Sequence, residues 1–95
     1  MIDGVVRNDE ARNRYEIRVD DEVVGFISYR TAGDGLAMVH AEVPQEWEGQ
    51  GVGSMLAAGA LDDVRARGLR VRPDCPFVAD FIDKHPEYAD LKMGS

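Results

Sequence analysis

Residues 47–54 read Trp-Glu-Gly-Gln-Gly-Val-Gly-Ser and lead directly into a run of residues with the spacing of a helix. Three glycines stand at alternate positions of this stretch: Gly49, Gly51 and Gly53. Because glycine has no Cβ, their backbone N–H groups can converge on an anion at the helix N-terminus, where the helix dipole also favours negative charge. The stretch therefore predicts a phosphate or pyrophosphate site where a strand gives way to a helix.

The same glycines are compatible with a tight turn between a strand and a helix. One glycine would suffice for such a turn, whereas three close together indicate that a ligand approaches the backbone. Two other phosphate motifs are excluded by the residues themselves. The dinucleotide-binding fingerprint would need its third glycine at Ser54, and the chain has no Gly-Lys-Ser/Thr sequence of a nucleoside-triphosphate loop.

The segment that follows the glycines predicts a helix, a short strand and a second helix. Apolar or small residues recur at positions 52, 55, 56, 59, 60 and 64, which is the spacing of one helix face. Gly68 is a natural stop for this helix, and a strand is expected over residues 69–71, ending before Pro73. A second helix is expected from about Pro76 to Lys84. Its buried face is expected to hold Phe77, Val78, Phe81 and Ile82.

The first half of the chain predicts strands joined by short polar turns. They are expected over residues 5–7, 14–19, 23–29 and 36–43. Tyr15, Ile17 and Val19 alternate with charged residues, which is the period of a half-buried strand. Short turns favour an antiparallel meander, and the helix between residues 36–43 and 69–71 makes those two strands parallel, with a right-handed crossover. The sequence thus predicts an α/β fold with a mixed (α+β) sheet: a meander, a β-α-β unit and a C-terminal helix.

Length and charge limit the class of protein. At 95 residues and a formal net charge of −7, the chain is expected to form one domain over residues 1–95. The acidic balance argues against a nucleic-acid-binding surface, which needs basic residues to meet backbone phosphates. It is compatible with a basic partner, such as an amine or a lysine-bearing substrate, and equally with a charge that only keeps the protein soluble.

The compartment is indicated by features that the sequence lacks. A single cysteine, Cys75, excludes an intrachain disulfide and fits a reducing environment. No stretch approaches the ~18 apolar residues of a membrane span, and residues 1–4 lack the charged and apolar regions of a signal peptide. We therefore expect a cytoplasmic monomer with no membrane or nucleic-acid partner, and we assign no metal site.

The arrangement of a strand, Val43-Pro44, the glycine stretch and a helix resembles the acyl-CoA pyrophosphate loop of the GNAT N-acetyltransferases. The family pattern Arg/Gln-x-x-Gly-x-Gly/Ala falls on residues 48–53. Further motifs resemble the minimal, YjdJ-type single-domain members of the family. These motifs are His-x-Glu-Val-Pro at 40–44, Arg-Pro-x-Cys-Pro-Phe-Val at 72–78 and His-Pro-Glu-Tyr at 85–88.

The resemblance implies that the chain binds acetyl-CoA and moves its acetyl group to a primary amine by direct attack. The acceptor would be a protein lysine, a peptide N-terminus or a small amine. Pantetheine would lie between the splayed parallel strands 36–43 and 69–71. The cofactor-binding residues implied are Val43, Glu48, Gly49, Gln50, Gly51, Val52, Gly53 and Ser54. Glu48 departs from the family pattern, and a carboxylate beside a pyrophosphate is repulsive, so we expect it to weaken CoA binding.

His40 and Glu42 are candidates for moving the amine proton. They share one face of strand 36–43, because side chains alternate along a strand, and a paired His and Glu can relay a proton. The alternative is that both simply line the solvent face of the strand, or that His40 is a hydrogen-bonded structural residue.

Cys75 is the third candidate. Pro76 suits the first position of the following helix, so Cys75 is expected near the N-cap, where the helix dipole favours a thiolate. It could donate a proton to the departing CoA thiolate or carry the acetyl group itself. The alternative is a small buried apolar residue, as most free cysteines are.

Two functions of other classes remain compatible with the sequence. A non-catalytic acyl-CoA-binding module would keep the glycine stretch and would not need His40, Glu42 or Cys75. An interaction domain would use its acidic surface to dock a basic partner and would not need CoA.

Overall fold

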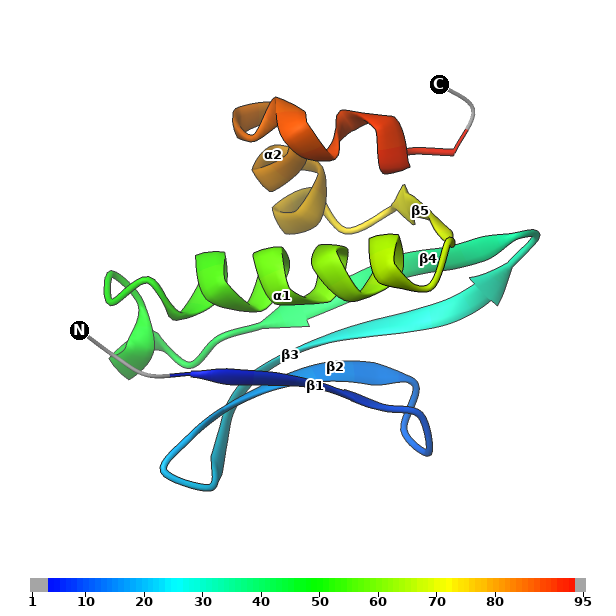
Figure 1. Ribbon diagram of the computed structural model, residues 1–95. Coiled ribbons are helices and arrows are strands. Elements are labelled where there is room, and N and C mark those ends of the chain that lie inside the picture. The colour runs from blue at the N-terminus through cyan, green and yellow to red at the C-terminus, as the bar shows by residue number, and fades with distance from the viewer. Residues whose placement is uncertain (1–3, 94–95) are drawn as a thin grey trace.

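The chain folds into a mixed five-stranded sheet with helices packed against it (Figure 1). The computed structural model describes residues 4–93. The strands are β1 (Val5–Asp9), β2 (Arg14–Val19), β3 (Glu22–Ala32), β4 (Gly35–Glu42) and β5 (Arg70–Pro73). The helices are α1 (Val52–Ala66) and α2 (Pro76–Lys84), with 3-10 turns η1 (Gln45–Trp47) and η2 (Pro86–Leu91). The strand order is β1-β2-β3-β4-β5, and only β4 and β5 are parallel, which confirms the predicted fold class.

Several predicted strand ends were wrong: the strand predicted over residues 23–29 continues to Ala32, because residues 30–32 pair with β4, and the ends of β1 and β5 also differ. β1 continues to Asp9 because Asn8 and Asp9 pair with β2 across the ladder, and this pairing outweighs the low strand propensity of both residues. β5 includes Pro73, which was expected to lie beyond it. Because Pro73 ends the last strand in the order of the sheet, its missing N–H leaves no gap inside the ladder.

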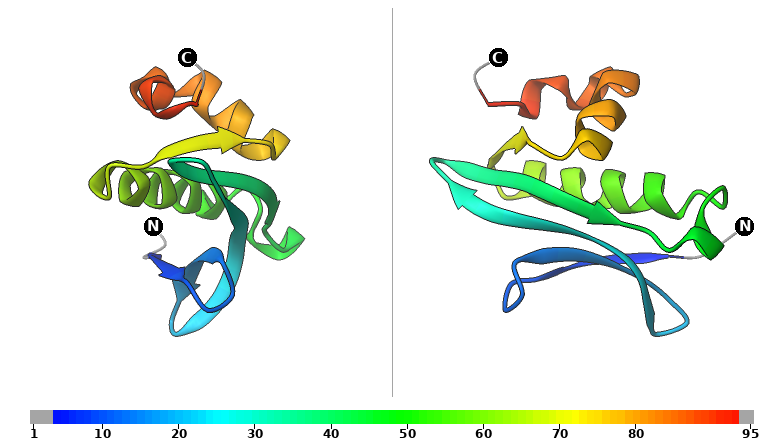
Figure 2. Two further views of the ribbon diagram at one scale, coloured as in Figure 1. Left: turned by 90° about the vertical axis from the view of Figure 1, so that its right-hand side faces the viewer. Right: turned by 180° about the vertical axis from the view of Figure 1, so that it is seen from behind.

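Helix α1 lies along one face of the twisted sheet, and α2 lies next to β4 and β5 (Figure 2). The apolar residues of β2 face α1, and Tyr15 and Ile17 are fully buried there together with Leu56 of α1. A Cβ on Gly59 would lie 2.6 Å from the side chain of Val6, so this glycine lets α1 approach β1 closely.

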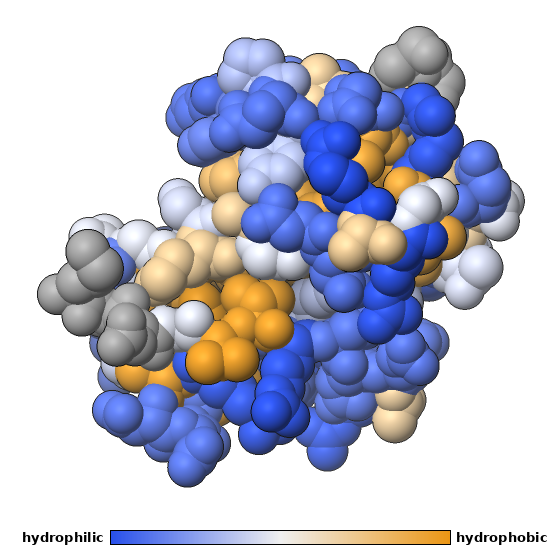
Figure 3. Space-filling model, viewed as in Figure 1, coloured by the Kyte–Doolittle hydropathy of each residue, from blue (hydrophilic) through white to orange (hydrophobic). Residues whose placement is uncertain are grey.

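The molecular surface is largely hydrophilic on the face of Figure 3, as expected for a chain of net charge −7. The largest apolar area lies at the lower left of that view, and smaller ones lie toward the upper right (Figure 3). No helix within residues 4–93 is long and apolar enough to cross a membrane.

The two parallel strands separate after four residue pairs. Their pairing runs from Gly35 opposite Arg70 to Met38 opposite Pro73, and the Cys75 N–H then donates to the Met38 carbonyl at 2.8 Å. At this point the register between β3 and β4 shifts by one residue, at Val39. Such a bulge bends a strand. β4 therefore diverges from the chain that follows β5, which is the predicted splay.

Candidate functional site

The glycine stretch connects η1 to α1, and two of its glycines are required by the backbone. Gly49 and Gly51 have φ angles of 80° and 82°, in the left-handed region that side chains disfavour. A Cβ at either position would meet nothing within 4 Å. The turn, and not crowding, therefore selects glycine at these two positions.

Gly53 is required for a different reason. It lies in the first turn of α1, where a Cβ would approach the Phe77 ring to 3.1 Å and the Val43 side chain to 3.9 Å. The third glycine thus keeps open the space between α1, α2 and the end of β4. The prediction that one glycine would suffice for the turn was wrong, because the backbone at both Gly49 and Gly51 needs glycine.

The first turn of α1 also leaves backbone donors unpaired within the helix. The first helical hydrogen bond runs from the Met55 N–H to the Gly51 carbonyl at 3.0 Å. The N–H groups of residues 52–54 precede it, and Gly51 at the N-cap has no side chain to accept from them. These donors and the positive end of the helix dipole are suited to an anion.

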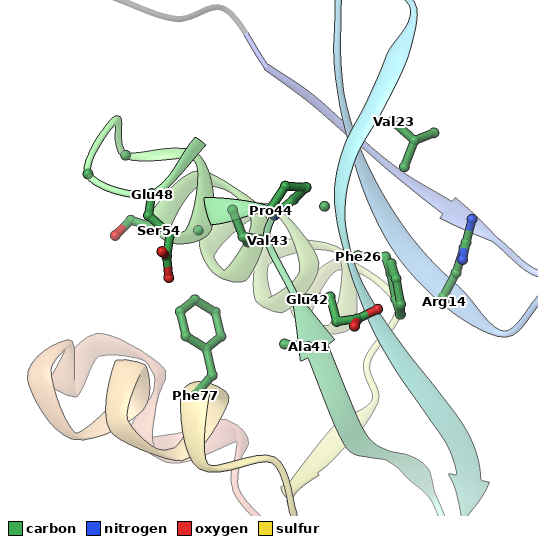
Figure 4. A pocket seen from close by; sticks show the side chains of 14 residues that line it. Arg14, Val23, Phe26, Ala41, Glu42, Val43, Pro44, Glu48, Ser54 and Phe77 are labelled. Carbon is green, nitrogen blue, oxygen red and sulfur yellow. The ribbon is translucent and has the colours of Figure 1, made fainter. Parts of the chain in front are cut away.

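A cavity of about 1060 Å³ joins this loop to the sheet (Figure 4). Its volume lies just above the usual range for ligand pockets, roughly 300–1,000 Å³. Six of the predicted cofactor residues line it: Val43, Glu48, Gly49, Gly51, Gly53 and Ser54. Phe77 reaches toward these residues from α2, and Glu42 lies at the border between the loop and the sheet.

Two predicted cofactor residues do not line the cavity. The Gln50 side chain turns back and donates to the Glu46 carbonyl at 2.9 Å. Val52 is fully buried in the core beneath α1. The Val52 side chain is therefore unavailable to a ligand of the loop, and the Gln50 side chain is turned away from the cavity.

His40 and Glu42 lie together on the face of β4 that points away from α1. Their Nε2 and Oε1 atoms are 3.8 Å apart, and each side chain is more than half exposed, at 59% and 62%. An exposed pair of this kind contributes little to stability, but it can pass a proton to solvent. Glu42 lines the cavity. His40 does not line it, but its ring contacts Phe26, which does.

Cys75 is the N-cap of α2, as expected, with Pro76 in the first turn. Cys75 is only 4% exposed and does not line the cavity. Its backbone is fixed by the hydrogen bond to Met38 at the point where β4 and β5 separate. The thiol thus belongs to the core at the closed end of the splay.

Several lining residues were not foreseen as part of the site, namely Arg14, Val23, Gly25, Phe26, Ala41 and Phe77. The prediction that Phe77 lies on the buried face of α2 was wrong, because its ring points into the cavity and is 39% exposed. Phe26 stands directly opposite Glu42, and Ser28 pairs with both Arg14 and His40. Alternation alone places Arg14 and Phe26 on outward faces of their strands, but only the register brings them to Glu42. Among the described residues that line the cavity, Arg14 is the one cation, whereas Glu42 and Glu48 are anions.

Comparison with known proteins gives consistent matches over most of the chain. A family model described as GCN5-related N-acetyl-transferase matches residues 14–91. Protein NATD1 of Bos taurus is 29% identical over 85 residues, which cover 85% of this chain and 74% of that protein. Protein NATD1 of Danio rerio is 27% identical over 90 residues, which cover 90% and 81%.

A solved structure has a similar fold. The solution structure of a GCN5-like protein from Staphylococcus aureus superposes on this chain with a TM-score of 0.71 at 25% sequence identity. The match covers 96% of this chain and 89% of that protein.

Proposed function

We propose, since this chain belongs to the GCN5-related N-acetyltransferase family, that it binds acetyl-CoA in the cavity at the glycine loop and acetylates a primary amine. The observation that carries the proposal is the continuity of that cavity. It runs from the unpaired N–H groups at the start of α1, past the diverging end of β4, to the carboxylate of Glu42.

The residues at the loop fit a pyrophosphate in two respects. The N–H groups of residues 52–54 and the helix dipole offer donors and positive potential, and Gly53 leaves the wall beside Phe77 free of a Cβ. The Glu48 carboxylate also lines the cavity and opposes a second anion there. We therefore propose that CoA binds through the backbone of the loop and that Glu48 limits its affinity.

The pantetheine part of the ligand would follow β4 from Val43 toward Val39, along the edge that no longer pairs with β5. Beyond Met38 this edge is free to offer backbone groups to an extended chain, in the way that a strand edge does. Phe77 supplies an apolar surface on the other side of the same space.

Acetyl-CoA supplies an acyl group activated as a thioester. The role of the protein would be to bring the amine, in its neutral form, to this thioester. We assign Glu42 and His40 to the amine proton, because they are adjacent, exposed to solvent and located at the cavity or directly behind it. We assign Cys75 to protonating the leaving thiolate; this requires that the sulfur end of the ligand enter between β4 and β5 as far as this nearly buried thiol, beyond the residues that line the cavity.

The proposal is tested by calorimetric titration with CoA, followed by release of free thiol from acetyl-CoA with a panel of primary amines. We expect binding, turnover, and a kcat about 100-fold lower in Glu42→Gln with an unchanged CoA Kd. Glu22→Gln at the exposed start of β3 is the matched control and keeps its kcat. CoA binding without turnover would support a non-catalytic module, and no binding at millimolar CoA would refute the cofactor assignment.

A further inference from the structure

A continuous series of contacts crosses the open face of the sheet. The Arg14 guanidinium carbon lies 4.6 Å from the centre of the Phe26 ring. The Phe26 and His40 rings are 6.1 Å apart between centroids, and His40 contacts Glu42 at 3.8 Å. These four residues, from β2, β3 and β4, are called the sheet-face cluster below; three of them, Arg14, Phe26 and Glu42, line the cavity (Figure 4).

Arg14 is held in place by a buried carboxylate. Its Nε donates to Glu16 at 2.8 Å, and Glu16 also accepts from Arg18 at 3.3 Å. Glu16 is only 1% exposed although it lies on the face of the sheet away from α1. Two arginines around one carboxylate leave one net positive charge at this end of the sheet-face cluster, whereas Glu42 is the anion at its other end. The Arg14 guanidinium is thus a preorganised cation on the cavity wall.

The cluster presents three chemistries in a row. At one end, Glu42 and His40 can accept a proton from an ammonium group. In the middle, the Phe26 ring, one face of which the Arg14 guanidinium covers, offers the apolar surface that remains exposed to the cavity. At the other end, Arg14 offers guanidinium donors of the geometry that carboxylates prefer.

We infer that the acceptor of this enzyme is a small primary amine that also carries a carboxylate, with the amine at Glu42 and His40, the carbon chain over Phe26 and the carboxylate at Arg14. The inference rests on the proposed acetyl transfer and adds the class of acceptor. The new amide C–N bond forms as the thioester C–S bond breaks, the amine proton leaves through Glu42 and His40, and the thiolate takes up a proton. A polyamine would place its second cation against Arg14, which is unfavourable.

The kinetic test compares amines that differ only by the carboxylate. Glycine, β-alanine and γ-aminobutyrate are compared with methylamine, ethylamine and propylamine at saturating acetyl-CoA, with free-thiol release as the readout. We expect at least one carboxylate-bearing amine to exceed its partner about 10-fold in kcat/KM, as one charge-assisted hydrogen bond would give.

Variants of Arg14 then assign the preference. The preference is the ratio of kcat/KM for the carboxylate-bearing amine to kcat/KM for its plain partner. Arg14→Gln is expected to reduce this ratio to about 1, mainly through KM, and Arg14→Lys is expected to restore part of it. Arg18→Gln removes the other partner of Glu16 and is not on the cavity wall, so it controls for the loss of a Glu16 contact and keeps the ratio. No preference in the unmodified protein, or a preference that survives Arg14→Gln, would overturn the inference.

A binding measurement separates this inference from the proposed function. β-Alanine and ethylamine are titrated, with and without CoA, while the NMR signal of the Arg14 Nε–H is followed. A shift with β-alanine alone supports the carboxylate site even in a protein that shows no turnover. If turnover of simple amines occurs without any such shift or preference, the acetyl transfer stands and the acceptor class is refuted.

Discussion

The Phe77 ring lies 3.1 Å from the point that a Cβ on Gly53 would occupy, so the first turn of α1 and the first turn of α2 approach closely at the cavity wall. Phe77 is 39% exposed, which is high for a large apolar residue. An aromatic ring at the mouth of a cavity, opposite a glycine, can contact a bound chain from one side while the backbone of α1 contacts it from the other.

Gly53→Ala should therefore separate stability from ligand binding. Alanine favours a helix by about 1 kcal/mol over glycine, and the exposed Phe77 ring can yield by a few tenths of an ångström. We expect the free energy of unfolding in urea to be unchanged or higher by up to that amount. We expect the CoA Kd to rise about 10-fold, because the new methyl group narrows the cavity.

Gly59→Ala is the matched control in the same helix. Its Cβ would lie 2.6 Å from the Val6 side chain in the core, so we expect a loss of about 1–3 kcal/mol of stability. If Gly53→Ala were as destabilising as Gly59→Ala, the Phe77 ring would be fixed by its surroundings and the cavity wall would be part of the core.

Glu48→Arg should tighten CoA binding. It replaces an anion on the cavity wall by a cation that can reach a pyrophosphate, and we expect the Kd to fall about 10-fold or more at low salt. The gain should shrink as ionic strength rises, because salt screens the interaction. Glu46→Arg makes the same charge change at an exposed residue that is not on the cavity wall, and calorimetry should show a much smaller gain. Equal gains in the two variants would mean that only net charge matters.

Because Tyr15 is buried and hydrogen-bonded, we expect the free energy of unfolding to fall at alkaline pH. Burial, and then the hydrogen bond from the Tyr15 hydroxyl to Asp63 at 2.7 Å, raise the pKa of this tyrosine above its ordinary value. The unfolded chain releases the tyrosine proton near pH 10, whereas the folded chain retains it. The folded state then binds more protons than the unfolded state, so the stabilising contribution is complete below about pH 10 and is lost as the pH rises further.

Tyr15→Phe tests this contribution in urea denaturations at neutral and alkaline pH. The variant should lose about 1 kcal/mol at pH 7, because the hydrogen bond is gone, and should show a shallower decline of stability above about pH 10. Tyr29 and Tyr88 also have raised pKa values, mainly through burial, so part of the decline should remain. An unchanged slope in Tyr15→Phe would show that the tyrosine does not titrate differently in the two states.

The parts of the site that depend on local signals were predicted from the sequence, and those that depend on pairing were not. Pro76 marks the start of α2 and the glycines mark the start of α1, because turns and caps are encoded within a few residues. Arg14 and Phe26 reach the cavity only through the register of the meander, which shifts after Ile17 and again at Val39. Such irregularities follow from packing across the sheet, so the strand pattern alone does not reveal them.

The last prediction concerns Cys75, whose N-cap position was predicted and whose near-complete burial agrees with the alternative of a small buried residue. If its thiol protonates the leaving CoA, Cys75→Ala should lower kcat about 100-fold while the CoA Kd stays the same. Removing a nearly buried side chain also lowers the free energy of unfolding by about 1 kcal/mol, so the control must be a variant that loses buried packing without losing a thiol. Val78→Ala removes fully buried methyl groups from the same helix without touching a thiol, and it should keep its kcat. An equal fall in both variants, or an unchanged kcat in Cys75→Ala and Cys75→Ser, would leave Cys75 as a packing residue that caps α2.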